Sequence, residues 1–439
     1  MESPGSSSMM PNGSGKGVIP PPSAHVSMRH RLVEAAHALG LGSEPNELGD
    51  FTTTPRVILM SLLAIFVGGL GAGAAWVLLK LIGIITNIAF YGRWGTNLAS
   101  PSGNHLGGFV ILIPVVGSII VGYMARYGTE QIRGHGIPEA IEGILIGGSK
   151  VLPKVAFWKP ISSAIAIGTG GPFGAEGPII MTGGALGSLV AQFLRLTSAE
   201  RKTLLVAGAA AGMAAVFGTP VAAVILAIEV LLFEFKPRSL IPVAVASVTA
   251  GLLRYFIIGY APLFHVPVHA VYPGVAGIFS ALLCGLLAGL MAIILTVAMY
   301  ACEDGYRKLP IHWMWWPAIG AVAVGIGGII QPRALGVGYD EIRFMLNGNL
   351  AMGTIVSLLI VKAVIWSISL ASGTSGGVIA PVLIIGCALG GVESLFLPHL
   401  GVGYWALISM AATLGGIYRS PLTAVVFAVE LTHDTNMLL

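Results

Sequence analysis

Residues 168–187 read GTGGPFGAEGPIIMTGGALG, a glycine-rich and otherwise apolar stretch with a single acid, Glu176. A carboxylate at membrane depth is costly unless it is paired, protonated or in contact with water. The following residues predict a helix over Ile179–Leu189, so Glu176 lies just ahead of a helix N-terminus, where unpaired backbone N–H groups attract anions. A carboxylate at the place where an anion would bind suggests a gate.

The composition is that of a membrane protein. Of the 439 residues, 55% are hydrophobic and 10% are charged, whereas a soluble domain carries about 25% charged residues. We therefore expect an all-α polytopic protein of tilted and partly re-entrant helices, with the lipid bilayer as its surroundings. The net charge of +4 is small and gives no reason to expect a nucleic-acid partner.

Cysteine and histidine give no sign of metal chemistry. Cys284, Cys302 and Cys387 are far apart, in or beside apolar segments, and we expect them to be small packing residues. His265 and His269 lie in a loop between two apolar segments, and we expect them at the surface. The sequence predicts no metal site and no cofactor.

The chain divides into a tail and a membrane domain. Residues 1–50 are rich in Gly, Ser and Pro and lack an apolar segment near Met1, which favours a disordered cytoplasmic segment over a cleaved signal peptide. Residues 51–439 are predicted to form the transmembrane domain. Six segments are long enough to span a bilayer: Val57–Ala89, Gly108–Ala125, Ser239–Ile258, Tyr272–Tyr300, Trp313–Ile330 and Gly353–Leu370. Seven shorter segments, cut by Gly and Pro, favour re-entrant or half-spanning helices that line a cavity: Ile137–Gly147, Ile161–Gly168, Ile179–Leu194, Leu204–Phe217, Val221–Phe235, Val378–Leu395 and Leu422–Leu431.

Two motifs recur in the same order. FGTPVAAVILAIEVL at 217–231 matches YRSPLTAVVFAVELT at 418–432, so that Glu229 corresponds to Glu430. GAEGPIIMTGGALG at 174–187 matches GVIAPVLIIGCALG at 377–390, where Ile379 stands opposite Glu176. The repetition predicts two duplicated halves, roughly 56–258 and 272–439, and short interrupted segments at matching positions of two halves indicate a transport site. Since Ile379 replaces the acid in the second half, the turn itself does not need it.

Three glycine-rich segments precede predicted helices. They are GHGIPEA at 134–140, GAEGP at 174–178 and GGVIAP at 376–381. Each offers a helix N-terminus with flexible backbone ahead of it. Three positive dipole ends that converge near the bilayer midplane would hold a dehydrated anion loosely, as conduction requires.

These three motifs resemble the signatures of the CLC family of chloride channels and chloride/proton antiporters, of the prokaryotic type, and the similarity extends from about Val57 to the end of the chain. The resemblance implies an inverted-repeat fold, a homodimer and one anion pathway in each subunit. It implies that Glu176 is the gate, which occupies the external anion site when ionised and swings away when protonated. It also implies the following anion-binding residues: Gly134, His135, Gly136, Ile137, Pro138, Gly174, Ala175, Gly177, Pro178, Gly377, Val378 and Ile379.

The sequence departs from the family pattern at three places. His135 stands where the family usually has a serine; a histidine either donates an N–H to the anion or points away and packs. Val230 stands where antiporters typically carry a second, internal glutamate. The family's anion-coordinating tyrosine comes from a later helix, and Tyr418 is not that residue. We therefore expect either an incomplete C-terminal end or a different inner gate.

The predicted function is selective transmembrane transport of chloride or a similar small anion through a pore gated by Glu176. Because Val230 is apolar, we expect passive or weakly coupled conduction, with a chloride/proton antiporter that has an atypical proton path as the alternative. Nitrate and fluoride remain open as substrates. A remote alternative is an intramembrane enzyme that uses Glu176 and a histidine as an acid–base pair; we expect no enzyme. The expected location is the inner or plasma membrane of the cell, as a multi-pass protein.

Overall fold

The computed structural model describes residues 53–259, 261–267, 269 and 273–438. Over these residues the chain forms fifteen α-helices, α2 to α16, with short 3-10 and π turns and no strand. The tail predicted at residues 1–50 lies outside the described residues. The expected all-α architecture is confirmed for the part of the chain that the structure describes.

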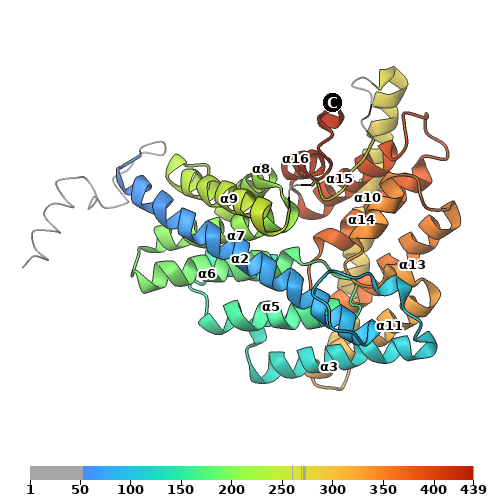
Figure 1. The fold of residues 1–439 in the computed structure, drawn as a ribbon, viewed down its shortest axis with the longest axis horizontal. Helices are drawn as coiled ribbons and strands as arrows, with labels where there is room; N and C mark the ends of the chain where they lie inside the picture. The colour runs from blue at the N-terminus through green and yellow to red at the C-terminus, as the bar shows by residue number, and fades with distance from the viewer. Residues whose placement is uncertain (1–52, 260, 268, 270–272, 439) are drawn as a thin grey trace, which may run out of the picture.

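Six of the helical segments are long and apolar enough to cross a membrane, and they match the six predicted spans. At 1.5 Å per residue the 36 residues of the first one extend about 54 Å, well beyond the ~30 Å hydrocarbon core, so this helix must tilt. Figure 1 shows it running obliquely across the molecule. The six are α2 (Arg56–Tyr91), η3 (Gly107–Ile111) with α3 (Leu112–Tyr127), α9 (Pro237–Ile257), α10 (Gly274–Arg307), η6 (Trp313–Trp315) with α11 (Trp316–Ile330), and α13 (Met352–Ala371).

The other nine helices are shorter or less apolar, and several begin or end inside the molecule. Two of them, α12 and α15, lie outside the predicted segments. The nine are α4 (Ile137–Leu145), α5 (Pro153–Gly168), α6 (Glu176–Phe193), α7 (Ser198–Phe217), α8 (Pro220–Leu226) continued by the π turn η5 (Ala227–Leu232), α12 (Tyr339–Leu346), α14 (Ile379–Glu393), α15 (Tyr404–Tyr418) and α16 (Pro421–Thr432).

The order α2 to α8 recurs as α10 to α16. Helix α6 packs on α7 as α14 packs on α15, and α3 and α8 contact their own counterparts, α11 and α16. Figure 1 shows both of these pairs side by side. Contacts between corresponding elements are what a two-fold relation between the halves produces.

The two halves are inverted with respect to the membrane. Arg56 at the start of α2 pairs with Glu200 at the start of α7, and Lys202 of α7 pairs with Glu234, which precedes α9. Helix α9 therefore begins at the membrane face where α2 begins, and it is long enough to cross. The chain leaves α9 at the opposite face, from which α10 starts, so α2 and α10 enter the membrane from opposite sides.

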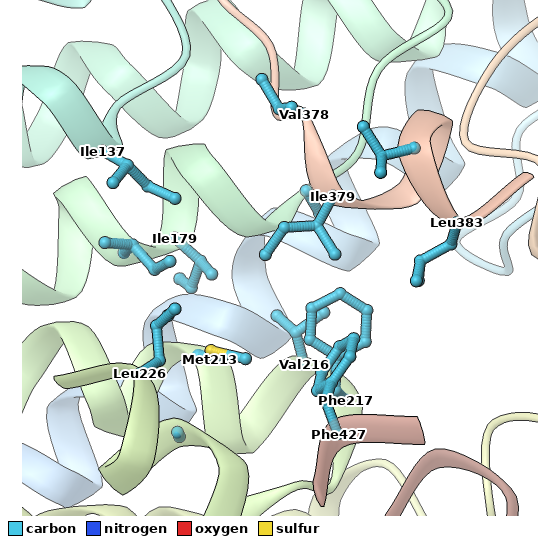
Figure 2. Packing of buried hydrophobic residues seen from close by; sticks show 14 of the residues in the cluster. Ile137, Ile179, Met213, Val216, Phe217, Leu226, Val378, Ile379, Leu383 and Phe427 are labelled. Carbon is cyan, nitrogen blue, oxygen red and sulfur yellow. The ribbon is translucent and has the colours of Figure 1, made fainter. Parts of the chain in front are cut away.

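The core is formed by small and aliphatic side chains, and α6 and α7 are nearly enclosed by other helices. Their axes approach closely because glycines face each other: a Cβ atom built on Gly183 would lie 2.2 Å from the carbonyl oxygen of Gly208. Small residues at helix interfaces are the usual way in which membrane helices gain packing contacts. Figure 2 shows the part of this core that includes Met213, Val216 and Leu226.

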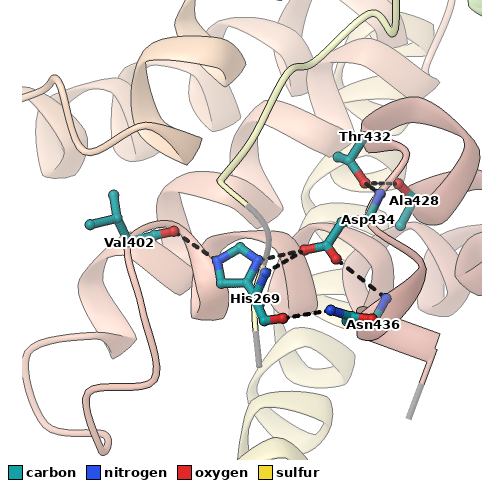
Figure 3. A network of polar contacts seen from close by, with 6 residues as sticks. All are labelled: His269, Val402, Ala428, Thr432, Asp434 and Asn436. Carbon is teal, nitrogen blue, oxygen red and sulfur yellow. Dashed lines mark hydrogen bonds and ion pairs between the residues drawn. The ribbon is translucent and has the colours of Figure 1, made fainter. Parts of the chain in front are cut away.

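His269 is not at the surface, contrary to the prediction. Its side chain is 3% exposed; Nδ1 lies 2.7 Å from Oδ2 of Asp434 and Nε2 lies 2.9 Å from the carbonyl oxygen of Val402. Asn436 donates to the backbone carbonyl of His269 at 2.8 Å, as Figure 3 shows. The connection between the two halves is thereby fastened to the segment after α16, and the polar groups that it buries are hydrogen-bonded. Within the described residues no group of three or more His, Cys, Asp or Glu side chains is placed to hold a metal.

Candidate anion site

The three glycine-rich loops cross one another backbone to backbone. Gly174 and Gly377, which correspond in the repeat, exchange hydrogen bonds of 3.1 and 2.9 Å between their N–H and C=O groups. A Cβ atom on Gly177 would lie 1.8 Å from the carbonyl oxygen of His135, and one on Gly136 would lie 2.4 Å from the carbonyl oxygen of Gly177. Only glycine permits this approach, so the motif glycines bring the starts of α4, α6 and α14 together.

Each of these helices begins at its glycine loop, and their N-terminal N–H groups differ in what they contact. Helix α4 begins at Ile137, and the N–H of the preceding Gly136 donates to the side chain of Glu139 at 2.7 Å. Helices α6 and α14 have no side chain of their own that caps them. The start of α14 instead receives a carboxylate from α6.

That carboxylate belongs to Glu176, which is 0% exposed and is the first residue of α6 rather than a residue ahead of it. Its Oε1 accepts a hydrogen bond from the N–H of Ala380 in the first turn of α14, and its Oε2 has no hydrogen-bond partner in the described structure. A Cβ atom on Gly174 would lie within 2.0 Å of either carboxylate oxygen. The acid thus occupies a helix N-terminus of the other half, a position that favours a negative charge.

Two fully buried lysines support the loops, and sequence reasoning missed both. The Nζ atom of Lys159 on α5 donates to the carbonyl oxygens of Ile132 and Gly134 at 2.9 and 2.8 Å. The ammonium of Lys362 on α13 donates to the carbonyl oxygens of Ala334 and Gly336 at 2.9 and 2.8 Å. The two lysines correspond in the repeat. A lysine at the same position of two otherwise apolar segments was the signal that could have identified them.

His135 lies at the crossing of the loops. Its carbonyl oxygen is packed against Gly177, while its ring nitrogen Nδ1 is buried and has no hydrogen-bond partner in the described structure. Pro138, in the first turn of α4, is exposed, whereas Val378 and Ile379 are buried. This position of the His135 ring is compatible with both predicted alternatives: that it donates an N–H to an anion, and that it only packs against its neighbours.

The remaining surface of the site is formed mainly by apolar side chains, together with the buried hydroxyl of Tyr339, and comes from both halves. Figure 2 shows Ile379 at the start of α14 approaching Phe217 at the end of α7. The ring of Phe217 packs edge-on against Phe427 at 4.9 Å and against Tyr339 at 6.2 Å between ring centroids. Such a lining provides no countercharge, which suits an anion that must leave again.

Glu229 and Val230 lie in η5, the π turn that continues α8. The carboxylate of Glu229 accepts hydrogen bonds from the N–H groups of Leu422 and Thr423 at 3.2 and 2.8 Å, and from the Thr423 hydroxyl at 2.5 Å. Glu229 therefore caps the N-terminus of α16. Val230 adds no polar group to the site.

A cavity of about 540 Å³ extends beside α4 to Gly134. It is lined by charged and apolar residues of α4 and of the loops around it. One of these residues is Lys150, which lies two positions after Gly148. The carbonyl oxygen of Gly148 accepts a hydrogen bond of 2.9 Å from Arg201, near the start of α7. The cavity thus extends from the Gly134 loop toward the membrane face from which α2 begins. Its lining includes Glu130, Arg133, Gly134, Glu139, Lys150 and Met181.

Comparison with known proteins gives consistent results. The sequence model of a family described as voltage gated chloride channel matches residues 117–439. H(+)/Cl(-) exchange transporters ClcA of Salmonella arizonae and Salmonella newport are 31% identical to this chain over 343 residues, which cover 73% of this chain and 70% of each relative. These relatives are exchange transporters by name.

Solved structures share the fold. A slow cyanobacterial Cl−/H+ antiporter superimposes with a TM-score of 0.73 at 21% identity, over 88% of this chain and 91% of that one. A CLC-type fluoride/proton antiporter gives 0.74 at 20% identity, over 88% and 93%. A eukaryotic CLC transporter gives 0.67 at 19% identity, over 87% and 70%. At these identities the likeness concerns the architecture, and it agrees with the two inverted halves.

Proposed function

Since the chain belongs to the family of voltage-gated chloride channels, we propose that it exchanges chloride, or a similar small anion, for protons across a membrane. The relatives that share 31% of its residues are named H(+)/Cl(-) exchange transporters. This favours the antiporter alternative over the passive or weakly coupled conduction that Val230 led us to expect. The structural neighbours that are antiporters share the same fold.

The observation that carries the proposal is the hydrogen bond between the Glu176 carboxylate and the N–H of Ala380. An ionised carboxylate and an anion compete for the same donor at the start of α14. A protonated carboxyl group no longer competes as an anion and leaves the donor to chloride. Because one position accepts either the charged acid or the transported ion, proton uptake by Glu176 and anion binding are coupled there.

The loops around Glu176 supply the remaining contacts in this proposal. The three crossing loops bind the anion through the twelve residues that the family resemblance indicates. The two buried lysines each bind a pair of carbonyl oxygens, those of Ile132 and Gly134 and those of Ala334 and Gly336, and so keep these oxygens away from the anion. Chloride is a substrate here and no cofactor is required. The homodimer and the identity of the membrane stay predictions; the mass of the detergent-solubilised protein, measured by sedimentation, tests the first.

Passive conduction is the second candidate, and Val230 is the observation that favours it. Glu229, the acid next to Val230 in the sequence, is hydrogen-bonded to the start of α16. A proton would therefore have to reach Glu176 by a route that has no acid at position 230. The cavity beside α4 is large enough to hold water. The two candidates differ in whether protons move with the anion.

Purified full-length protein in liposomes tests the proposal. With a chloride gradient and no proton gradient, exchange drives protons uphill, which a pH electrode detects while a chloride electrode follows the anion. We expect Glu176→Ala to retain chloride movement and to lose proton movement, and Glu229→Gln to retain both. Chloride movement without protons in the unaltered protein would establish passive conduction, and no anion flux at all would refute transport.

A further inference from the structure

Tyr418 occupies a position that corresponds to Phe217. Tyr418 is the last residue of α15 and Phe217 is the last residue of α7; each is followed by a residue with positive φ, Arg419 (54°) and Gly218 (75°), and then by the start of the next helix. The repeat thus keeps an aromatic ring at both places. Only the second ring carries a hydroxyl group.

The first of these rings lies in the apolar lining of the site. Phe217 packs on Tyr339 and Phe427, and its side chain lies near Ile379 at the start of α14. The repeat pairs Phe217 with Tyr418 and Ile379 with Glu176. Because Phe217 lies near Ile379, the two-fold relation between the halves implies that the ring of Tyr418 lies near Glu176 at the start of α6. The hydroxyl of Tyr418 therefore joins the buried hydroxyl of Tyr339 in a lining that is formed mainly by apolar side chains.

The hydroxyl of Tyr418 is buried and has no hydrogen-bond partner in the described structure. A buried hydroxyl without a partner is unfavourable, so a partner is expected during the working cycle. The charged group that acts on this hydroxyl electrostatically is the carboxylate of Glu176. The Tyr418 hydroxyl is therefore close enough to Glu176 to interact with its carboxylate. It is then also close to an anion that replaces this carboxylate.

We propose that Tyr418 is a specificity-determining residue whose O–H donates a hydrogen bond to the transported anion beside Glu176. This inference rests on the proposed function and names a ligand that the family resemblance does not assign. A phenol donates one strong hydrogen bond and binds most favourably those anions that accept such bonds well. The corresponding phenylalanine in the first half donates none, so the site is asymmetric and its selectivity comes from the second half.

The test replaces Tyr418 by Phe, which makes the position identical to its counterpart and removes one oxygen atom. Isothermal titration in detergent measures the affinity for chloride and for thiocyanate, a larger anion that accepts weaker hydrogen bonds. We expect Tyr418→Phe to weaken chloride binding about tenfold, because a hydrogen bond to a charged group is lost, and to weaken thiocyanate binding less. Melting in chloride-free buffer is expected to be unchanged.

Tyr306→Phe is the matched control. The hydroxyl of Tyr306 is also buried without a partner in the described structure, but Tyr306 lies at the end of α10, where its ring packs against Trp316 at the start of α11, so chloride affinity should stay the same. Equal chloride affinity in Tyr418→Phe and the unaltered protein, an equal loss in both variants, or a lower melting temperature as the main effect would overturn the role of Tyr418. If the unaltered protein neither binds nor moves chloride, the proposed function fails instead.

Discussion

Glu229 and Glu430 cap each other's helices across the two halves. The carboxylate of Glu229 accepts from the N–H groups of Leu422 and Thr423 at the start of α16, the helix that carries Glu430. The carboxylate of Glu430 accepts from the N–H groups of Val221 and Ala222 at 3.0 and 2.7 Å, at the start of α8, which leads to Glu229. A carboxylate at a helix N-terminus satisfies unpaired donors and complements the helix dipole.

Removing either carboxylate should destabilise the contact between α8 and α16. We expect Glu430→Ala to lower the free energy of unfolding by ~1–3 kcal/mol, as for hydrogen bonds to a charged group, and Glu229→Ala to do the same. Thermal melting in detergent measures both effects. Glu229→Gln keeps an acceptor oxygen and should preserve proton movement in liposomes; loss of proton movement with unchanged melting would show that Glu229 carries protons rather than capping α16.

The buried lysines should matter for stability through the loops that they hold. Lys159→Met keeps the length of the side chain but leaves the carbonyl oxygens of Ile132 and Gly134 without their donor, and we expect a loss of ~2–5 kcal/mol in the free energy of unfolding. Lys154→Met on the exposed face of the same helix is the control and should change little. Equal stability of the two variants would show that the Gly134 loop does not depend on Lys159.

Five of the six long spans were predicted to within about two residues at each end, because each is a continuous apolar run, which is the strongest sequence signal that a membrane protein has. Helix α12 was missed because Asp340, Glu341 and Arg343 interrupt its apolar pattern, although Ile342 and Met345 are buried. Helix α10 continues past its predicted end at Tyr300 and places Glu303 on its last turns, where it pairs with Arg307.

The anion site was predicted as three glycine-rich helix starts, and the structure brings these together. The contacts that organise them were not predictable, because they join residues between 25 and 204 positions apart in the sequence. Nothing in the local pattern relates Glu176 to the N–H of Ala380, or Lys362 to the carbonyl of Ala334. The prediction of His269 at the surface failed for the same reason, since its partner Asp434 comes from the other end of the second half.

The crossing of the loops should depend on glycine at position 177. Gly177→Ala would bring a Cβ atom to 1.8 Å from the carbonyl oxygen of His135, so the backbone must separate. We expect loss of chloride binding and poor folding, seen as early elution or aggregation in size-exclusion chromatography. Gly73→Ala in α2 meets nothing within 4 Å and should be neutral or slightly stabilising, by up to ~1 kcal/mol. Full chloride affinity in Gly177→Ala would contradict the backbone-to-backbone crossing.

The buried pair of His269 and Asp434 should be coupled. Asp434→Ala leaves the His269 ring buried without its acceptor, and we expect a loss of ~3–5 kcal/mol, as for a broken buried pair. The double variant with His269→Ala should be less destabilised than the sum of the two single variants, because the second change removes the group that was left unpaired. Additive losses, measured by thermal melting, would show that the two side chains act independently.

The pH dependence of transport should arise from Glu176. In the unaltered protein, acid protonates the carboxylate and frees the N–H of Ala380 for chloride, so chloride flux should rise as the pH falls from about 7.5 to about 4.5. Glu176→Gln is uncharged at every pH in this range; its flux and its chloride affinity should therefore be independent of pH, while the side chain still fits beside Gly174. Glu303→Gln, in a surface ion pair at the end of α10, keeps the pH response of the unaltered protein. A pH response that persists in Glu176→Gln would show that another group titrates, because this variant has no ionisable side chain at position 176.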